Sequence, residues 1–581
     1  MLQYNPDVIF LTDICSPGFG RYAGTYRCAT ELRDKGYEVQ VIEFFCRYTT
    51  EQLKQILTKF ITRDTLWIGV STTFLQPVRY DQWQWANKDK QSAHSRITGE
   101  PVKLDKSSWW HSVQGDRLAH VVGRFDWPEI VDHIRYLNPD CKIVFGGAKA
   151  GYNVFPDPKE DDKYVDIRMV GQSENSLIEV TQALEQKKRY SKVMTRPYDD
   201  FPQSRIRFLD HDLIFDKEAL PIEIARGCIF KCSFCAFDLN GKKMWEYNRS
   251  PENIREELQY AYDKWGTTGW MFSTDTYNDS PKKVKMFHDE FNKMDHKIDF
   301  SSYARLDMML TRPETIKLCY DTGLRSVLFG VETFNQKAGK ALGKGMDPVK
   351  QQEGLYRIRE ECPDLIIGVA MIVGLQHDTE EIMRKNNEWF LKPDCPVDAI
   401  TYSPLWIDNN SWLSADNTTA KSKMQKDPMY YGYELLGDGE WIRESDGLTR
   451  KRCRELSDEF SGLFDQFGDK KDMELTSRGT RNGSWQFYSR LKNLGYSLED
   501  LRSNKVVGEE MIKKEDRLKA IYHERLSTHL CMPSSVLISA VNPVHSRSSD
   551  VFCTNSDLLP LITTWPPFFI TPSAIILPTP V

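Results

Sequence analysis

The chain has 581 residues, of which 40% are hydrophobic and 28% are charged, and its formal net charge is −6. This is the ordinary composition of soluble globular proteins, and the length predicts about three or four domains. The small net charge gives no specific signal for nucleic-acid binding or for attraction to a membrane surface.

Cysteine usage indicates a reducing compartment. The 13 cysteines include only one tight group, and the others are scattered, which is no disulfide framework. The first residues lack the basic flank and apolar core of a signal peptide. No apolar run free of proline is long enough to span a membrane. We therefore expect a cytoplasmic protein without a membrane partner.

Residues 1–195 are predicted to form a first α/β domain. Short apolar runs alternate with helical patterns such as Gly24–Lys35, which typifies a parallel, doubly wound, Rossmann-like sheet. Such sheets bind ligands at the carboxyl ends of their strands. The predicted strands are Val8–Leu11, Val39–Ile42, Ile68–Ser71, Lys142–Phe145 and Asp166–Val170.

Two loops of this domain carry a family resemblance. The pattern resembles the cobalamin-binding domain that precedes many radical S-adenosylmethionine (SAM) barrels. In that family, the loops after the third and fourth strands hold the nucleotide tail. The residues at those places are Ser71, Thr73, Gly146 and Gly147. The other interpretation of the paired glycines is a tight turn.

The loop after the first strand departs from that family. The family's DxHxxG loop supplies a histidine to cobalt, but the corresponding segment Asp13–Gly20 contains no histidine. Two alternatives follow. Cobalamin binds without a protein ligand to cobalt, or the domain has kept the fold and lost the cofactor.

Three further segments of this region are interpreted structurally. Residues 76–125 are a polar insertion rich in tryptophan, which would be either a surface excursion or a lid over the ligand crevice. The turn Gly171–Glu174 resembles one in the relatives and is assigned to the fold. Lys187–Gln203 is polar, contains two prolines and is predicted to be a linker.

The segment Cys228-Ile-Phe-Lys-Cys232-Ser-Phe-Cys235 carries the main chemical signal. Three thiolates at this spacing can hold three irons of a cubane iron–sulfur cluster and leave the fourth iron open. A zinc site usually needs a fourth Cys or His at short spacing, and the next cysteine, Cys319, is far along the chain. The spacing therefore favours a [4Fe–4S] cluster and leaves zinc as the alternative.

This segment resembles the radical SAM signature CxxxCxΦC, with Phe234 in the aromatic place against the adenine. The resemblance implies that SAM chelates the open iron and is reductively cleaved to methionine and a 5′-deoxyadenosyl radical. It also implies a reductant such as a ferredoxin or flavodoxin.

Residues 204–408 repeat the strand–helix pattern six times, as expected of a partial (β/α)6 TIM-type barrel with its chemistry at the carboxyl ends of the strands. Resemblance to the family assigns SAM-binding roles to five more residues. Asp275 would attract the ammonium, Arg305 would pair with the carboxylate, Glu332 would accept from the ribose, and Ile372 and Val373 would line the adenine. The alternative for Arg305 and Glu332 is an ordinary barrel salt bridge.

The last third of the chain gives little chemical information. Residues 409–525 are charged and aromatic and are predicted to form a helical extension, and the family resemblance implies that it covers the open barrel. Residues 526–581 turn rich in proline and poor in charge, which predicts a disordered or appended tail.

These patterns predict a radical SAM enzyme, with cobalamin-dependent methyl transfer as one specific form. A radical SAM oxidoreductase or cyclase that has lost cobalamin is the first alternative. A non-catalytic zinc-binding scaffold and a cobalamin-dependent light or redox sensor are the others. The substrate cannot be read from these residues.

Overall fold

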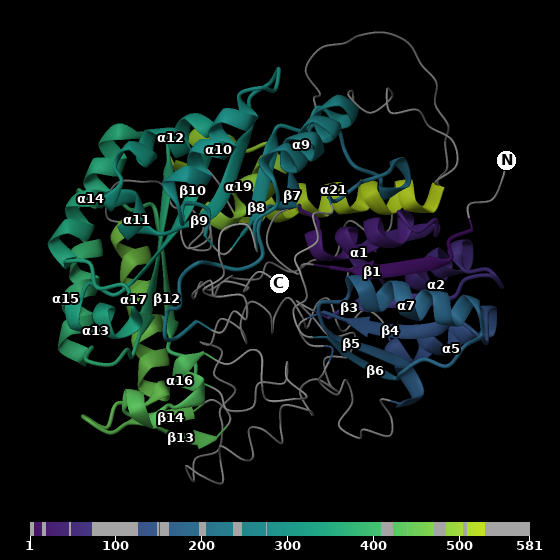
Figure 1. Ribbon diagram of the computed structural model, residues 1–581, viewed down its shortest axis with the longest axis horizontal. Coiled ribbons are helices and arrows are strands. Elements are labelled where there is room, and N and C mark those ends of the chain that lie inside the picture. Colours follow the sequence, from purple (N-terminus) through teal and green to yellow (C-terminus); the bar gives the residue numbers. More distant parts are fainter. Residues whose placement is uncertain are drawn as a thin grey trace.

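The computed structural model describes two α/β layers, each built on a sheet of parallel strands. A set of C-terminal segments contacts both layers (Figure 1). The described residues are 5–13, 19–45, 48–72, 126–147, 150, 162–196, 205–235, 247–274, 276–407, 422–437, 440–469, 484–502 and 508–528. The predicted insertion 76–125 lies outside them. The predicted tail 526–581 also lies outside them, except for residues 526–528, which form the end of the helix Gly508–Thr528 and are not disordered as predicted.

The first layer is a six-stranded parallel sheet in the order β2-β1-β3-β4-β5-β6. Helices α1 and α7 pack together, as do α2 and α5. Their apolar residues fall into two separate clusters, which shows that the two pairs cover opposite faces of the sheet. The bounds are β1 Val8–Thr12, α1 Ala23–Arg33, β2 Val39–Glu43, α2 Thr50–Phe60, β3 Trp67–Ser71, α5 Trp127–Leu137, β4 Lys142–Gly146, β5 Ile167–Gly171, α7 Glu174–Glu185 and β6 Val193–Arg196.

Local sequence explains why these elements begin where they do. Strands β1, β2 and β3 are buried at every position, as expected when helices cover both faces of a parallel sheet. Helix α2 begins with a capping box in which Thr49 and Gln52 satisfy each other's backbone N–H groups. Strand β6 lies inside the segment predicted to be a linker, where it pairs with β5 and extends the sheet.

The second layer is also six-stranded and parallel, in the consecutive order β12-β11-β10-β9-β8-β7. Consecutive order with intervening helices is the arrangement expected of a partial barrel, so both layers confirm the predicted fold class. The bounds are β7 Leu220–Glu223, α9 Pro251–Trp265, β8 Gly269–Ser273, α10 Pro281–Phe291, β9 Asp299–Ala304, α11 Leu306–Thr311, α12 Glu314–Thr322, β10 Leu324–Glu332, α13 Gln336–Leu342, α14 Pro348–Glu361, β11 Ile366–Val373, α15 Glu380–Phe390 and β12 Ala399–Pro404.

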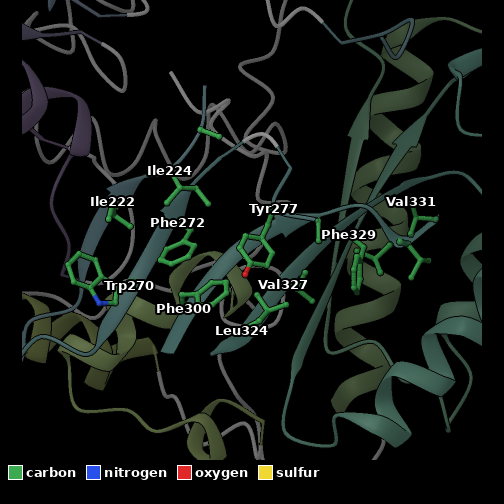
Figure 2. Packing of buried hydrophobic residues seen from close by; sticks show 14 of the residues in the cluster. Ile222, Ile224, Trp270, Phe272, Tyr277, Phe300, Leu324, Val327, Phe329 and Val331 are labelled. Carbon is green, nitrogen blue, oxygen red and sulfur yellow. The ribbon is translucent and has the colours of Figure 1, made fainter. Parts of the chain in front are cut away.

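Aromatic packing fixes the middle of this second sheet (Figure 2). The rings of Phe272 on β8 and Phe300 on β9 stack with their centres 4.1 Å apart, and Tyr277 packs against both. Offset aromatic pairs of this kind add to the free energy gained from apolar burial. These rings lie beside β7, the strand that leads to the cysteine segment, because β8 is the neighbour of β7 in the sheet.

The C-terminal segments return to both layers. Helix α19 lies across the second sheet, where Ser489 donates to the carbonyl of Trp270 at 2.9 Å. Helix α21 instead covers the first layer, where the hydroxyl of Tyr522 accepts from the backbone N–H of Glu43 at 3.2 Å. The bounds are α16 Lys423–Lys426, β13 Tyr433–Gly437, β14 Glu440–Arg443, α17 Arg450–Asp469, α19 Ser484–Asn493, α20 Leu498–Arg502 and α21 Gly508–Thr528. The hairpin β13–β14 differs from the wholly helical extension that was predicted. Of the helices described, none combines the length and the apolar character needed to cross a membrane.

A substitution in one turn of the second layer is expected to lower the stability of the protein strongly. Gly323 has φ +120°, and a Cβ at this position would lie 2.2 Å from the carbonyl oxygen of Ile298. Gly323→Ala is expected to lower the free energy of unfolding by about 2–4 kcal/mol through strain and overlap. Gly432 has φ +79° with nothing within 4 Å, so Gly432→Ala should cost only about 1 kcal/mol. Urea unfolding midpoints compare the two, and equal midpoints would contradict the overlap argument.

Candidate active site

The three clustered cysteines lie in the loop that follows β7, at the carboxyl end of the second sheet. Gly227 makes the turn with φ +120°, a conformation that other residues rarely adopt. Cys228 is buried, Cys232 and Cys235 are half-buried, and all three are outside any disulfide. The N–H of Cys235 donates to the carbonyl of Cys232 at 3.3 Å, which folds the second half of the segment into a tight turn.

This cysteine loop is braced from two sides. The backbone N–H and the hydroxyl of Ser233 donate to the carbonyls of Leu342 and Ala341, each at 3.1 Å. The carbonyl of Ser233 accepts from the N–H of Met424 in α16 at 3.0 Å. A short helix of the C-terminal segment therefore fixes the loop, which no motif in the sequence indicated.

Two of the three thiols contact polar side chains from other parts of the second layer. Among the residues that the structure describes, no three Cys, His, Asp or Glu side chains converge as ligands of one metal ion would. The cysteine sulfurs of a cubane cluster sit on separate irons and are spread more widely than those around zinc. Cys228 lies 3.4 Å from the hydroxyl of Thr276, and Cys232 accepts from Arg305 at 3.4 Å. Two of the three thiols therefore have polar partners among the residues that follow β8 and β9.

Arg305 is placed beside the cysteines at the end of β9. Its Nε and Nη2 donate to Asp307 at 2.9 and 2.5 Å, and its guanidinium carbon lies 3.7 Å from the ring centre of Phe230. Burial opposes ionisation of Asp307, but Arg305 outweighs it and holds the pKa of this carboxyl below its usual range. The pairing of Arg305 with the carboxylate of SAM stays a prediction, because its fork faces Asp307 here.

Glu332 is placed at the end of the neighbouring strand β10. It adopts φ +69°, and the pairing register with β11 shifts at this point. Lys344 donates to its carboxylate at 2.8 Å and to the carbonyl of Gly330 at 2.6 Å, and lies 6.0 Å from the ring centre of Phe234. Glu332 and Phe234 thus share one neighbour, Lys344. No motif in the sequence indicated this contact, because Glu332 ends β10 whereas Lys344 follows α13.

Two predicted adenine contacts lie one strand further along. Ile372 and Val373 end β11, next to β10 in the sheet, with Ile372 half-buried and Val373 buried. Asp275 falls outside the described residues. The structure therefore brings the cysteines, Arg305 and Glu332 to one edge of the sheet, and their roles toward SAM stay predictions.

A buried group of four charges connects this edge to the first layer. Arg226, two residues before Cys228, donates to Glu223 at 2.7 Å and to Glu174 at 2.7 Å. Arg27 of α1 contacts both carboxylates as well. Burial opposes ionisation of Glu174, but the two guanidinium groups outweigh it and hold its pKa at about 2. The glycine–acid turn assigned to the fold thus joins the two layers directly behind the cysteine loop.

The predicted cobalamin residues lie at the carboxyl edge of the first sheet. Ser71 ends β3 and pairs with Gly146 at the end of β4, and Gly147 turns away with φ +101°. The backbone N–H and hydroxyl of Thr72 both donate to the carbonyl of Gly146, at 2.7 and 3.0 Å. Thr73 lies outside the described residues. The roles of these residues toward cobalamin stay predictions.

Parts of this chain are similar in sequence to known proteins. Residues 222–389 match the radical SAM superfamily. Bacteriochlorophyllide d C-8(2)-methyltransferase of Chlorobaculum tepidum is 27% identical over 252 residues, which cover 40% of this chain and 52% of that protein. Anaerobic magnesium-protoporphyrin IX monomethyl ester cyclase of Cereibacter sphaeroides is 22% identical over 298 residues, 44% of this chain and 46% of that protein. The chain thus spans about half the length of these curated relatives.

A solved structure matches over most of the chain. It is the radical SAM methyltransferase TsrM from Kitasatospora setae, with a TM-score of 0.54 and 15% identity, covering 88% of this chain and 100% of TsrM. The segment that matches the radical SAM superfamily contains the three cysteines of the loop that follows β7. The two-layer architecture of this chain is shared with TsrM. The structure of TsrM has also been solved with cobalamin and a [4Fe–4S] cluster bound.

Proposed function

We propose that this protein cleaves SAM reductively and uses cobalamin for methyl transfer to a substrate. The observation that carries the first part is the gathering of Cys228, Cys232, Cys235, Arg305 and Glu332 at one sheet edge within the radical SAM domain. The similarity to methyltransferases and the shared architecture with cobalamin-bound TsrM support the second part.

The chain's own residues bind and orient the reactants. When bound, the cluster supplies an electron to SAM, and its chemistry belongs to the cofactor rather than to the protein. The three thiolates hold three irons, and Phe234, Ile372 and Val373 provide apolar contacts for the adenine. Glu332, held by Lys344, accepts from the ribose hydroxyls. Asp275 attracts the ammonium group, and the electron comes from a ferredoxin or flavodoxin.

The edge of the first sheet offers room for the cobalamin tail at Gly146. Of the described atoms, a Cβ added there would approach only the Cβ of Met169, at 3.8 Å. Among the described residues, nothing near this position requires glycine, whereas close approach of a ligand to the backbone would. Ser71, Thr73, Gly146 and Gly147 are the residues proposed to hold the nucleotide tail.

Gly146→Val is expected to weaken cobalamin binding at least tenfold while leaving the melting temperature and the iron content unchanged. The added side chain would occupy the space proposed for the ligand. Binding is measured by titration with cobalamin in an absorbance assay. Gly462→Val in α17, where nothing lies within 4 Å, is the matched control and should bind normally. Equal affinity in the two variants would remove this site.

The function is tested anaerobically with SAM labelled in its methyl group, a strong reductant and added cobalamin. Release of 5′-deoxyadenosine supports reductive cleavage, and transfer of the label to cobalamin supports the methyltransferase. Cleavage without cobalamin binding would instead favour an oxidoreductase or cyclase. That alternative is supported by the absence of histidine in residues 13–20 and by the similarity to the cyclase.

A further inference from the structure

Arg305 lies where its charge and its hydrogen bonds act on a cysteine ligand. It follows β9 directly, and its backbone is locked to Asn278 by reciprocal hydrogen bonds of 2.7 and 2.9 Å. The residue is only 5% exposed. Its Nη1 donates to the sulfur of Cys232 at 3.4 Å.

The other nitrogens of the guanidinium and one of its faces also have partners. Asp307 accepts from Nε and Nη2, and the ring of Phe230 covers one face at 3.7 Å. The planar guanidinium group of Arg305 is therefore held between the carboxylate of Asp307, the ring of Phe230 and the sulfur of Cys232. In this geometry the Nη1 edge points at the sulfur, and the paired edge normally used for bidentate carboxylate binding faces Asp307.

We propose that Arg305 is a positioning residue that raises the reduction potential of the cluster through its hydrogen bond to Cys232. Hydrogen bonds to cluster sulfurs and nearby positive charge stabilise the reduced, more negative state. Asp307 holds the fork in place and offsets part of its charge. This inference rests on the proposed cluster. It makes Cys232, rather than the carboxylate of SAM, the main partner of Arg305.

The test is a redox titration of the reconstituted full-length protein, followed by electron paramagnetic resonance. Arg305→Met removes the donor and the charge while keeping an extended side chain. It is expected to lower the ratio of reduced to oxidised cluster about tenfold at a fixed potential, which is about 59 mV for one electron. SAM affinity, measured by calorimetry, should change less than threefold.

Arg325 supplies a matched control. It also lies over a ring, 4.3 Å from the centre of Tyr320, and it also pairs with a carboxylate, Asp299, at 3.4 Å. It stands at the amino end of β10, the opposite end of the sheet from the cysteine loop. Arg325→Met should therefore leave the potential of the cluster unchanged.

Other outcomes would contradict either this inference or the proposed function on which it rests. A normal potential with SAM affinity reduced more than tenfold in Arg305→Met would assign Arg305 to the SAM carboxylate and overturn the inference. If Arg305→Met fails to fold, Arg305→Lys and Asp307→Asn take its place. The first should shift the potential downward and the second upward, and wild-type potentials in both would overturn the proposal. A wild-type protein that never assembles a cluster would overturn the proposed function instead.

Discussion

Cys228→Ala, Cys232→Ala and Cys235→Ala are each expected to abolish both the cluster and the cleavage of SAM. Each thiolate would hold a different iron, so the two remaining ligands cannot retain the cubane. We expect iron content and the visible absorbance of the reconstituted protein to fall to background. The rate of 5′-deoxyadenosine formation should drop by at least about 1,000-fold, because the cofactor carries the chemistry.

The control for these variants is Cys319→Ala. Cys319 is fully buried in the second layer, packed among apolar residues away from the cysteine loop, and burial raises the pKa of its thiol. Its truncation should cost roughly 1 kcal/mol of stability and leave iron content unchanged. If a motif variant kept both iron and cleavage activity, these cysteines would not be the cluster ligands. A colourless wild-type protein that binds stoichiometric zinc would favour the scaffold.

Glu174→Gln is expected to loosen the contact between the two layers. It leaves Arg27 and Arg226 facing only one carboxylate, Glu223, in a buried site. Breaking a buried ion pair from one side typically costs about 3–5 kcal/mol. A loss of this size should lower the melting temperature on the order of 10 °C. Arg226 precedes the cysteine loop, so reconstitution of the cluster should also become less complete.

Acid dependence provides a second signature of this group. Glu174 has a folded-state pKa of about 2, below its ordinary value of 4.5, so its contribution is present at neutral pH. It is lost as the pH falls from about 4.5 towards 2. The wild-type melting temperature should decline across that interval, and the Glu174→Gln protein should show a shallower decline.

Glu256→Gln serves as the comparison for this prediction. Glu256 pairs with Arg205 at 2.8 Å, but both side chains are about half exposed, at 47% and 50%. Exposed pairs contribute at most about 1 kcal/mol, so the variant should melt almost normally. Equal melting temperatures for Glu174→Gln and Glu256→Gln would show that the buried group does not hold the layers together.

The fold was largely predictable because its signals are local. Buried strands alternate with capped helices, as at α9, where Ser250 caps the helix and Gly266 ends it. Strand β6 was missed because four residues in a polar segment carry no periodicity, and pairing with β5 decides their conformation. The hairpin β13–β14 was missed for a similar reason, since its aromatic residues suggested packing helices.

The site was predictable only where its residues form a motif. The cysteine spacing identifies the cluster loop from a few consecutive residues. The bracing by α16, the contact of Lys344 with Glu332 and the four-charge group join residues on separate elements. Arg27 and Glu223 lie 196 residues apart, and no local pattern records such a pair. These contacts are decided by tertiary packing.

The return of α21 to the first layer has a consequence for synthesis of the protein. Phe44 and Glu43 lie near the start of the chain, yet Tyr522 packs against the one and accepts a hydrogen bond from the other. Glu43 and Tyr522 lie 479 positions apart, so a ribosome must translate that length of chain before this surface can be covered. Until then, the nascent first sheet exposes apolar residues that chaperones bind. Products that stop before Gly508 would keep that surface open and become targets for degradation.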